Sequence, residues 1–453
     1  MKLPTLLAST LFAALLFAGG KPDTPRNVIL FIGDGMSVPQ RMVAEEFSIK
    51  TGNGKLAMNA LPCHSTTRTC SASSLVTDSA AAATAIACGE KTRNGMLGVD
   101  KDGNRLESCA EAAKQAGLKV GIVTSVTINH ATPAGFYAHR KHRSMLYEIG
   151  LDLIASRFDM FLGGGLAGAN GRTDSPEYRG NLYALAAEEG WTVAEGREAF
   201  DSLCAEGPVP GRRIWWRSGE RELPYAIDKA GDDKPRLPEL TKLALDFLQD
   251  GFFLMVEGGR IDYAGHANEA ATNLRDLLEL DDAVKMALEF QKSHPDTLVI
   301  VTGDHETGGM SMGFAGTGYA FYMERLASQT CSSAAFEKRY EALRKEKGSA
   351  CTFEDAIPLV EQSYGLLFAN DGSGNPMVLK EDEIESLKKH FKGDGFGDKL
   401  RRIMQERAGV GWTSSAHTGL PVLTTASGPC AGLFTGLNDN TDISKKIKSF
   451  YGR

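Results

Sequence analysis

The sequence has no run of lysine and arginine residues and no basic patch interleaved with aromatic side chains, so nothing in it indicates nucleic acid binding. Beyond the first 20 residues, no stretch is long and apolar enough to span a membrane. None of the eight cysteines has the spacing of a zinc ribbon, and the chain has neither an internal repeat nor a low-complexity tract. These absences argue against a nucleic-acid-binding module, an integral membrane protein and a repeat protein.

The chain has instead the composition of a globular protein. It contains 453 residues, of which 42% are hydrophobic and 24% charged, and its formal net charge is −7. These values are ordinary for a folded protein and leave ample chain to bury a large core. The length predicts one large α/β domain or a domain with a large insertion.

The first 20 residues have the pattern of a secretory signal peptide. Lys2 precedes an apolar run over residues 3–18, and small residues close the segment at 18–20. A retained membrane anchor or a buried helix is the alternative, but the run is short for a bilayer span and contains Pro4. We therefore predict a signal peptide at residues 1–20, export to the periplasm or the extracellular space, and a mature domain over residues 21–453.

An exported chain can form disulfide bonds, and its eight cysteines are an even number. Cys331 and Cys351 flank a predicted helix and are candidates for closing a loop, as are Cys63 and Cys70. The alternative is that these cysteines are buried free thiols.

Four apolar segments are predicted to be buried strands that end in polar turns. The strands lie within residues 27–37, 118–125, 252–256 and 297–302. Apolar residues at helical spacing predict intervening helices at 106–116, 238–249 and 273–292. Continuously apolar strands are typical of a parallel sheet that is covered on both faces. The alternation predicts an α/β fold with a doubly wound, mostly parallel central sheet flanked by helices on both faces.

Residues from about 310 to 412 break this alternation. They contain helical patches joined by glycine-rich segments, at 354–367, 380–391 and 398–408. We predict that this region is a crown-like insertion that covers the active face. A strand at 421–425 and a closing helix from about residue 441 follow it.

Acidic residues gather where the predicted strands end or helices begin, and histidines follow them. The acidic residues are Asp34, Asp78, Glu257, Asp262 and Asp304, and the histidines are His266, His305 and His417. In an open α/β sheet, ligands bind beyond the carboxyl ends of the strands, so these groups are expected to converge. Clustered carboxylates repel one another unless cations bind, and a mixture of histidine and aspartate ligands suits zinc. Each pair alone is weak evidence, but the set predicts a metal centre.

The spacing of these residues adds two expectations. Asp262 and His266 are four residues apart, so they share one face if the segment is helical. Asp304 and His305 are adjacent, so we expect them to diverge from an irregular turn towards different positions.

Ser79 follows Asp78 and precedes a run of good helix formers. A serine at the start of a helix lies beside free backbone N–H groups and the positive end of the helix dipole, where a phosphate can bind. The alternative is an ordinary helix cap, because aspartate and serine are both favoured there. Together with the predicted metal centre, the position makes Ser79 a candidate nucleophile.

With these residues in place, the chain resembles the alkaline phosphatase family. The matching runs occur in the order of the family and span almost the whole mature chain, at 31–36, 77–80, 131–135, 256–262, 302–309 and 415–419. The resemblance implies that the chain hydrolyses small phosphate monoesters through a phosphoserine at Ser79. It also implies a homodimer.

The resemblance further implies two zinc ions and one magnesium ion. The first zinc would be held by Asp262, His266 and His417, and the second by Asp34, Asp304 and His305, next to Ser79. Magnesium would be held by Asp34, Thr132 and Glu257. Arg143 lies at the matching distance after Thr132 and would hold the phosphate with its planar fork; the alternative for Arg143 is a solvated residue at a helix start.

Two positions near the implied phosphate site depart from variants of the family. Tyr263 stands where some members carry a histidine or lysine that touches the phosphate, and tyrosine brings no positive charge. His130 stands where some bacterial members carry aspartate, which lowers the negative charge near the third metal. Both residues are candidates for the surroundings of the phosphate, and they leave the pH optimum and the affinity for magnesium open.

The nucleophile needs a strong activator. No histidine is adjacent to Ser79 in the sequence, and a helix terminus supplies only about 0.3–1 kcal/mol. A zinc ion lowers the pKa of a bound hydroxyl by several units, so we expect the metal to activate Ser79.

Two other classes of function remain open from the sequence. The first is another enzyme of the same superfamily, a phosphodiesterase, a sulfatase or a phosphate-transferring mutase, although no cysteine here opens the Cys-x-Pro-x-Arg run of a sulfatase. The second is an exported protein that binds phosphate or metal without turnover.

Overall fold

A computed structural model describes residues 24–229, 231–370, 372–393 and 395–452. The predicted signal peptide at 1–20 lies outside these residues. No helix in the described part of the chain has the length and apolar character needed to cross a bilayer.

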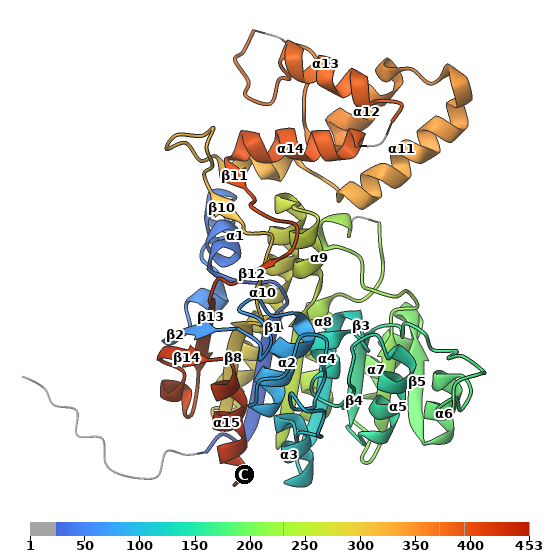
Figure 1. Ribbon diagram of the computed structural model, residues 1–453, viewed down its shortest axis with the longest axis vertical. Coiled ribbons are helices and arrows are strands. Elements are labelled where there is room, and N and C mark those ends of the chain that lie inside the picture. The colour runs from blue at the N-terminus through green and yellow to red at the C-terminus, as the bar shows by residue number, and fades with distance from the viewer. Residues whose placement is uncertain (1–23, 230, 371, 394, 453) are drawn as a thin grey trace, which may run out of the picture.

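The body of the protein is a ten-stranded sheet in the order β14-β2-β13-β8-β1-β7-β3-β4-β6-β5 (Figure 1). The strands from β8 to β5 in this order are parallel, whereas β13 is antiparallel to both of its neighbours. The strands are β1 (Asn27–Gly33), β2 (Cys63–Arg68), β3 (Lys119–Thr127), β4 (Met160–Gly164), β5 (Trp191–Glu195), β6 (Arg213–Arg217), β7 (Phe252–Gly258), β8 (Thr297–Gly303), β13 (Val422–Ser427) and β14 (Gly436–Asp439). The predicted mostly parallel sheet is confirmed.

The four strands predicted from apolar runs are four adjacent central strands of this sheet. All seven residues of β1, β7 and β8 are buried, as is every residue of β3 except the first. Alternate residues of β1 enter two separate cores, with Phe31 on one side of the sheet and Ile32 on the other. A strand that is covered on both faces has no polar side, which is why these segments carry continuous apolar sequence.

Helices cover both faces of the sheet, as predicted. The first core contains residues of α1 (Val38–Lys50), α8 (Leu237–Leu248) and α10 (Ala270–Ser293). The second contains residues of α2 (Ser79–Cys88), α3 (Cys109–Gln115), α5 (Leu146–Ala155), α6 (Leu182–Glu188) and α15 (Thr441–Phe450). Two further helices, α7 (Gly196–Glu206) and α9 (Arg260–His266), follow β5 and β7.

Helix α2 is buried along its whole length, which anchors the position of Ser79. Its alanine-rich sequence lets neighbouring elements approach closely. A Cβ atom at Gly135 would lie 2.7 Å from the Cβ of Ala83, so the turn after α4 (Ala131–Ala134) can pack on α2 only with glycine there. This contact brings His130 and Thr132 beside the start of α2.

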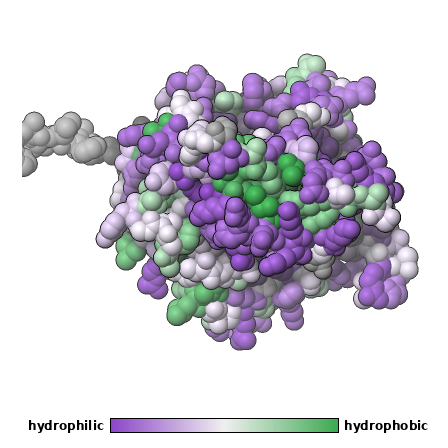
Figure 2. Space-filling view, turned by 90° about the horizontal axis from the view of Figure 1, so that it is seen from above, coloured by the Kyte–Doolittle hydropathy of each residue, from purple (hydrophilic) through white to green (hydrophobic). Residues whose placement is uncertain are grey.

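Residues 323–408 form a separate helical lobe (Figure 1). It contains α11 (Ser333–Lys347), α12 (Phe353–Tyr364), α13 (Glu381–His390) and α14 (Phe396–Ala408), so the three predicted helical patches are confirmed within a few residues. Aromatic residues fill its core, including Phe336, Tyr340 and Phe396. Two-residue strands β10 (Ser311–Met312) and β11 (Val410–Gly411) pair where the lobe leaves the body. Seen from the side of the lobe, the surface is mostly hydrophilic around an apolar area (Figure 2).

The two candidate disulfides are absent, and the alternative that the sequence left open holds. Cys63, Cys70, Cys331 and Cys351 are free thiols. The 15 residues of α11 separate Cys331 from Cys351 by about 22 Å of helix, and a disulfide requires Cα atoms within about 7 Å. The extended strand β2 separates Cys63 from Cys70 in the same way.

Candidate active site

Three acidic residues meet at the carboxyl ends of the adjacent strands β7, β1 and β8. Gly33 of β1 is in register with Gly258 of β7 and with Gly303 of β8. Asp34 and Asp304 therefore lie at one level, just beyond their strands, and Glu257 lies in register with Ile32, near the end of β7. All three are fully buried. The convergence expected from a parallel sheet is confirmed for these carboxylates.

The first group of ligand-type side chains contains Asp34, Asp304 and His305. Nε2 of His305 lies 3.3 Å from Oδ1 of Asp34 and 3.2 Å from Oδ2 of Asp304. The expected divergence of Asp304 from His305 is wrong. Oδ1 of Asp304 accepts hydrogen bonds from the backbone N–H groups of Gly35 at 3.0 Å and of His305 at 2.8 Å, which turns its Oδ2 towards the His305 ring.

Gly35 makes this arrangement possible. Its φ of 72° lies in the left-handed region, and a Cβ atom there would come within 3.0 Å of Oδ1 of Asp262 and 2.9 Å of Oγ1 of Thr307. The backbone of the turn after β1 can thus pass directly beside two groups of the site.

The second group contains Asp34, His130 and Glu257. The hydroxyl of Thr132 donates to Oδ2 of Asp34 at 3.1 Å, so Thr132 lies where the resemblance implies. Nδ1 of His130 lies 3.8 Å from Oδ2 of Asp34 and 4.0 Å from Oε1 of Glu257. Burial, together with the charge of Arg143, lowers the pKa of His130 to about 3, so this ring is neutral.

The third group contains Asp262, His266 and His417. Helix α9 places Asp262 and His266 on one face as predicted, with Nε2 of His266 3.4 Å from Oδ2 of Asp262. His417 belongs to β12 (His417–Thr418), which pairs with β9 (Glu306–Thr307) and brings Nε2 of His417 to 3.5 Å from Oδ1 of Asp262. Both rings have a carbonyl at Nδ1, that of Ser415 at 2.6 Å and that of Thr77 at 2.9 Å, which leaves both Nε2 atoms for a ligand.

Charge is balanced inside this third group. Burial alone would raise the pKa of Asp262, but the hydrogen bond to His266 and the positive charge of His266 outweigh it and hold that pKa well below its usual range. The hydrogen bond to Asp262 raises the pKa of His266 to about 9. Asp262 and His266 thus form an ion pair.

Ser79 lies between these groups. Asp78, not Ser79, is the N-cap of α2 and accepts a hydrogen bond from the N–H of Ala81 at 3.0 Å, so the simple capping alternative for Ser79 is wrong. The buried Oγ of Ser79 lies 3.2 Å from Nε2 of His305. The sequence placed no histidine beside Ser79, but the turn after β8 brings one there.

Asp78 does not join the carboxylates, contrary to the expectation. Its Oδ2 accepts hydrogen bonds from the N–H of Gly95 at 3.0 Å and from Nη1 of Arg143 at 3.3 Å. Nη2 of Arg143 lies 3.1 Å from Nε2 of His130. The guanidinium of Arg143 is therefore held beside Ser79, whereas that of Arg140 is paired with Asp152 at 2.6 Å.

Tyr263 follows Asp262 on α9 and lies beside His130. The two rings meet edge to face with their centroids 5.8 Å apart. The guanidinium of Arg260 lies 5.3 Å from the centre of the Tyr263 ring. Burial raises the pKa of the Tyr263 hydroxyl well above its usual value, so this group stays a neutral hydrogen-bond donor.

Sequence reasoning missed Glu306 and Thr307, although both lie in the same run as Asp304 and His305. The buried carboxylate of Glu306 accepts hydrogen bonds from Nε2 of Gln40 at 2.6 Å, from the N–H groups of Gly309 and Met310 at 3.0 and 3.1 Å, and from the hydroxyl of Thr418. The hydroxyl of Thr307 donates to Oδ1 of Asp262 at 2.5 Å. These bonds join the loop that carries His305 to the segment that carries His417.

The side chains fit divalent cations. Oδ1 of Asp34, Oε1 of Glu257 and Oδ2 of Asp304 are buried and have no hydrogen-bond partner among the described residues. Burial and the neighbouring carboxylates raise the pKa of Asp34 well above its usual range, and burial raises the pKa of Glu257 to about 7. Burial likewise raises the pKa of Asp304. Unpaired buried carboxylates of this kind are stabilised by bound cations, and histidine with aspartate suits zinc while oxygen ligands suit magnesium.

Comparison with known proteins agrees with this geometry. The sequence model of the family described as "Alkaline phosphatase" matches residues 25–452. Alkaline phosphatase 3 of Bacillus subtilis is 32% identical over 445 residues, which cover 94% of this chain and 89% of that protein. The cold-active alkaline phosphatase of the psychrophile Shewanella sp. matches with a TM-score of 0.79 at 29% identity, covering 94% of this chain and 100% of that one. A histidine-to-aspartate variant of the TAB5 alkaline phosphatase, solved with Mg bound in its M3 site, matches with a TM-score of 0.68 at 26% identity, covering 95% and 99%.

Proposed function

Because the chain belongs to the alkaline phosphatase family and is a phosphate monoester hydrolase, we propose that Ser79 is its nucleophile and that the three ligand groups hold two zinc ions and one magnesium ion. The first zinc is assigned to Asp262, His266 and His417, the second to Asp34, Asp304 and His305, and magnesium to Asp34, Thr132 and Glu257. The unpaired buried oxygens of Asp34, Asp304 and Glu257 support this assignment. When bound, the metals lower the pKa of the attacking hydroxyl and of water and stabilise the charge that develops on the entering and leaving oxygens.

In the proposed reaction, Oγ of Ser79 forms a bond to phosphorus while the bond between phosphorus and the ester oxygen breaks. The alcohol leaves and the phosphate remains on Ser79. Water then attacks the phosphoserine, which releases inorganic phosphate and restores the hydroxyl. The N-terminus of α2 directs free backbone N–H groups at this phosphate, because Asp78 accepts only the N–H groups of Ala81 and Ala82 within the helix.

Arg143 is assigned the equatorial phosphate oxygens. Asp78 and His130 each contact one of its terminal nitrogens, which orients the guanidinium and leaves further N–H donors free. Two parallel hydrogen bonds from arginine to phosphate give both charge stabilisation and orientation. His130 acts here by aligning Arg143 as a neutral ring, and Tyr263 lies behind it as a neutral donor.

The observation that carries this assignment is the position of Ser79, with its Oγ 3.2 Å from Nε2 of His305 at the start of a buried helix. Ser79→Ala removes the attacking oxygen without adding volume. We expect turnover of p-nitrophenyl phosphate to fall at least about 10³-fold, because covalent catalysis is lost. The zinc and magnesium contents should stay unchanged, and phosphoserine should no longer be trapped by acid quenching. Ser449→Ala, on the exposed face of α15, is the matched control.

Near-normal steady-state turnover in Ser79→Ala contradicts the assigned nucleophile. A diesterase is distinguished by comparing p-nitrophenyl phosphate with its bis(p-nitrophenyl) ester. The orientation of Arg143 towards Ser79 favours the monoester, because its charge matches the dianionic phosphate.

Export and dimerisation are proposed on separate grounds. The pattern at residues 1–20 supports export to the periplasm or the extracellular space with cleavage of the leader. The homodimer rests on the resemblance to the family. N-terminal sequencing of the secreted protein and sedimentation equilibrium test the two points.

A further inference from the structure

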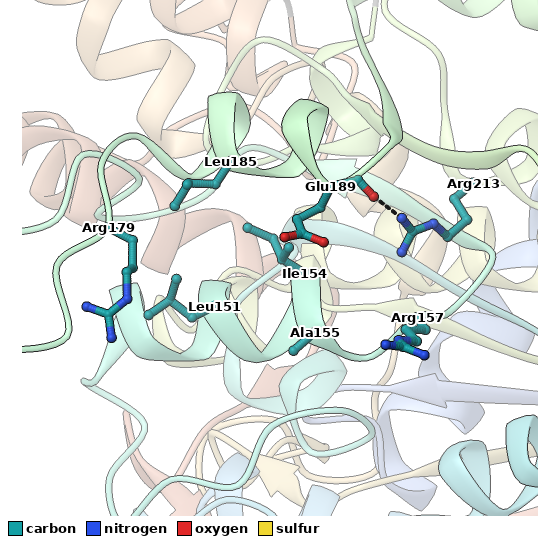
Figure 3. A pocket seen from close by; sticks show the side chains of 8 residues that line it. All are labelled: Leu151, Ile154, Ala155, Arg157, Arg179, Leu185, Glu189 and Arg213. Atoms are coloured by element: carbon teal, nitrogen blue, oxygen red, sulfur yellow. Dashed lines mark hydrogen bonds between the residues drawn. The ribbon is translucent and has the colours of Figure 1, made fainter.

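A cavity of about 720 Å³ lies between α5 and α6, and the mechanism makes no use of it (Figure 3). Leu151, Ile154 and Leu185 line its middle (Figure 3). Arg157 and Arg213 lie at one end and Arg179 at the other (Figure 3). We call this space the α5–α6 cavity. Its volume is typical of a site for a small organic ligand.

The α5–α6 cavity is distinct from the catalytic site. Arg157 precedes β4, and Arg213 is the first residue of β6, so both lie at the amino ends of parallel strands. Asp34, Glu257 and Asp304 lie at the carboxyl ends of strands in the same parallel part of the sheet. The arginine-rich end of the cavity therefore faces the opposite edge of the sheet.

The positive charge in this cavity is not neutralised. Among the described residues, no carboxylate lies within 4.0 Å of the side-chain nitrogens of Arg157, Arg179 or Arg213. Arg213 lies over the ring of Trp191 at 4.8 Å. It also donates to the backbone carbonyl of Glu189 (Figure 3). The guanidinium of Arg213 is thus held in place by two uncharged groups, which do not neutralise its positive charge. Glu189 contributes the negative charge of the lining, so three arginines and one glutamate leave a net charge of +2.

Arg157 adds a second, independent observation. It directly follows the C-cap of α5 with a φ of 58°, in the left-handed region that favours glycine at this position. A long charged side chain is an unfavourable choice for this backbone conformation. Strain of this kind is often retained where the side chain serves a function, and here the side chain lines the cavity.

We propose that the α5–α6 cavity binds a small amphiphilic anion, an alkyl or aryl carboxylate or sulfonate. Its apolar body packs on Leu151, Ile154 and Leu185. Its acid group accepts hydrogen bonds from the guanidinium groups of Arg157 and Arg213, whose planar forks match an oxyanion. The ligand is held without covalent chemistry, and catalysis at Ser79 continues independently.

The test uses the metal-loaded enzyme with saturating inorganic phosphate, which occupies the catalytic site. Fluorescence titration with 8-anilinonaphthalene-1-sulfonate should show saturable binding at one site. Octanesulfonate should displace the dye, whereas octyltrimethylammonium should not, because the cavity is positive. Arg157→Gln should weaken binding about tenfold, as expected for the loss of one charge-assisted hydrogen bond. Arg172→Gln is the control, since Arg172 is an exposed arginine paired with Asp174 at 2.8 Å outside the cavity.

Arg157→Gly separates binding from folding. Glycine relieves the left-handed backbone strain, so the melting temperature should rise while dye affinity falls. All these variants should hydrolyse p-nitrophenyl phosphate at the normal rate. Equal affinity in Arg157→Gln and the parent protein overturns the proposal, as does equal displacement by the cationic amphiphile or unsaturable dye uptake. Because turnover is measured on the same protein preparations without added phosphate, a failure of the phosphatase assignment is seen separately.

Discussion

The ligand groups fall into two kinds, which differ in how the negative charge of their carboxylates is compensated. The Asp262 group lies at the surface, where the side chain of His266 is 41% exposed, and its carboxylate is paired with a protonated histidine. The two groups that share Asp34 are fully buried at their carboxylates and contain unpaired oxygens. The exposed group can exist without a metal as an ion pair, whereas the buried groups must either protonate or bind cations. We infer that the buried groups depend most on metal, and that the exposed group exchanges it most readily.

Removal of all metal should have the largest effect. Chelation is expected to abolish turnover, since the activation of Ser79 is then lost. Loss of metal should be biphasic, with one zinc leaving the exposed Asp262 group before the metals of the buried groups. Elemental analysis of samples withdrawn during dialysis against a chelator, beside an assay of each sample, measures both phases.

Reconstitution gives the control for this experiment. Zinc should restore activity and magnesium alone should not, because histidine ligands in two of the groups suit zinc. Full recovery with magnesium alone contradicts the zinc assignment. Loss of all metals in a single phase contradicts the difference between exposed and buried groups.

The stability of the metal-free protein should depend on pH in two ranges, one set by the buried groups and one by the exposed group. The pKa of Glu257 is raised in the folded state from 4.5 to about 7, so its contribution to stability is present below pH 4.5 and is lost as the pH rises through 7. This loss is about 3 kcal/mol. The pKa of His266 is raised to about 9, so its smaller, solvent-screened contribution is lost between pH 6.5 and 9.

Denaturant unfolding of the metal-free protein between pH 4 and 9 measures these two windows. Glu257→Gln should reduce the fall in stability through the lower window, to which the raised pKa values of Asp34 and Asp304 also contribute, and His266→Gln should reduce the fall through the upper one. If both substitutions change the same pH range, the distinction between the two kinds of group is wrong. Asp262 acts in the opposite sense, because its lowered pKa makes stability fall only below its usual pKa of 3.8.

Glu306 connects the exposed and the buried groups, and Glu306→Gln tests that link. Glutamine keeps the size of the side chain but replaces one acceptor oxygen by an amide nitrogen, which then faces the N–H of either Gly309 or Met310. The pairing of β9 with β12 should weaken, and with it the placement of His417. We expect zinc affinity to fall about 10–100-fold, the range seen when residues that orient metal ligands are replaced.

Competition with a zinc indicator measures this affinity, with Glu385→Gln on exposed α13 as the matched control. The zinc of the exposed group should weaken more than that of the buried group, because Asp304 keeps its own backbone hydrogen bonds. Equal loss at both sites means that Glu306 acts on the fold as a whole.

The fold, and the gathering of most of the candidate ligand side chains, could be predicted from the sequence for identifiable physical reasons. Buried parallel strands such as β1 and β7 carry continuous apolar sequence, and their carboxyl ends must meet, which brings Asp34 and Glu257 together. The proximity of His305 to Ser79 came only from the resemblance, because it depends on the path of the turn after β8, for which local sequence gives no geometry. The role of Asp78 was missed. Asp78 was expected to join the other carboxylates, but it caps helix α2 and pairs with Arg143 instead.

Some functional residues lay in matching runs and still escaped notice. Glu306 and Thr307 follow His305 directly, but acidic and hydroxyl residues after a turn are common, and only their partners on α1, α9 and β12 show what they do. The sequence left the choice between disulfides and free thiols open because a count of cysteines contains no distance. Element lengths, which the sequence did suggest for α11, would have excluded the pairing of Cys331 with Cys351.

The smallest expected effect concerns magnesium in the buried group of Asp34 and Glu257. His130→Asp replaces a neutral ring by a carboxylate beside these two, which should strengthen magnesium binding about tenfold through charge and an added oxygen ligand. Isothermal titration of the zinc-loaded protein measures the affinity, with His139→Asp as a control because His139 binds Glu111 and the carbonyl of Gly98 away from the site. Arg143 loses the nitrogen of His130 as a partner, so the KM for substrate should change while magnesium binding tightens. If the magnesium affinity is unchanged, a shortage of negative charge does not limit magnesium binding in this buried group. The difference in metal binding between the buried and the exposed groups then comes from solvent access alone.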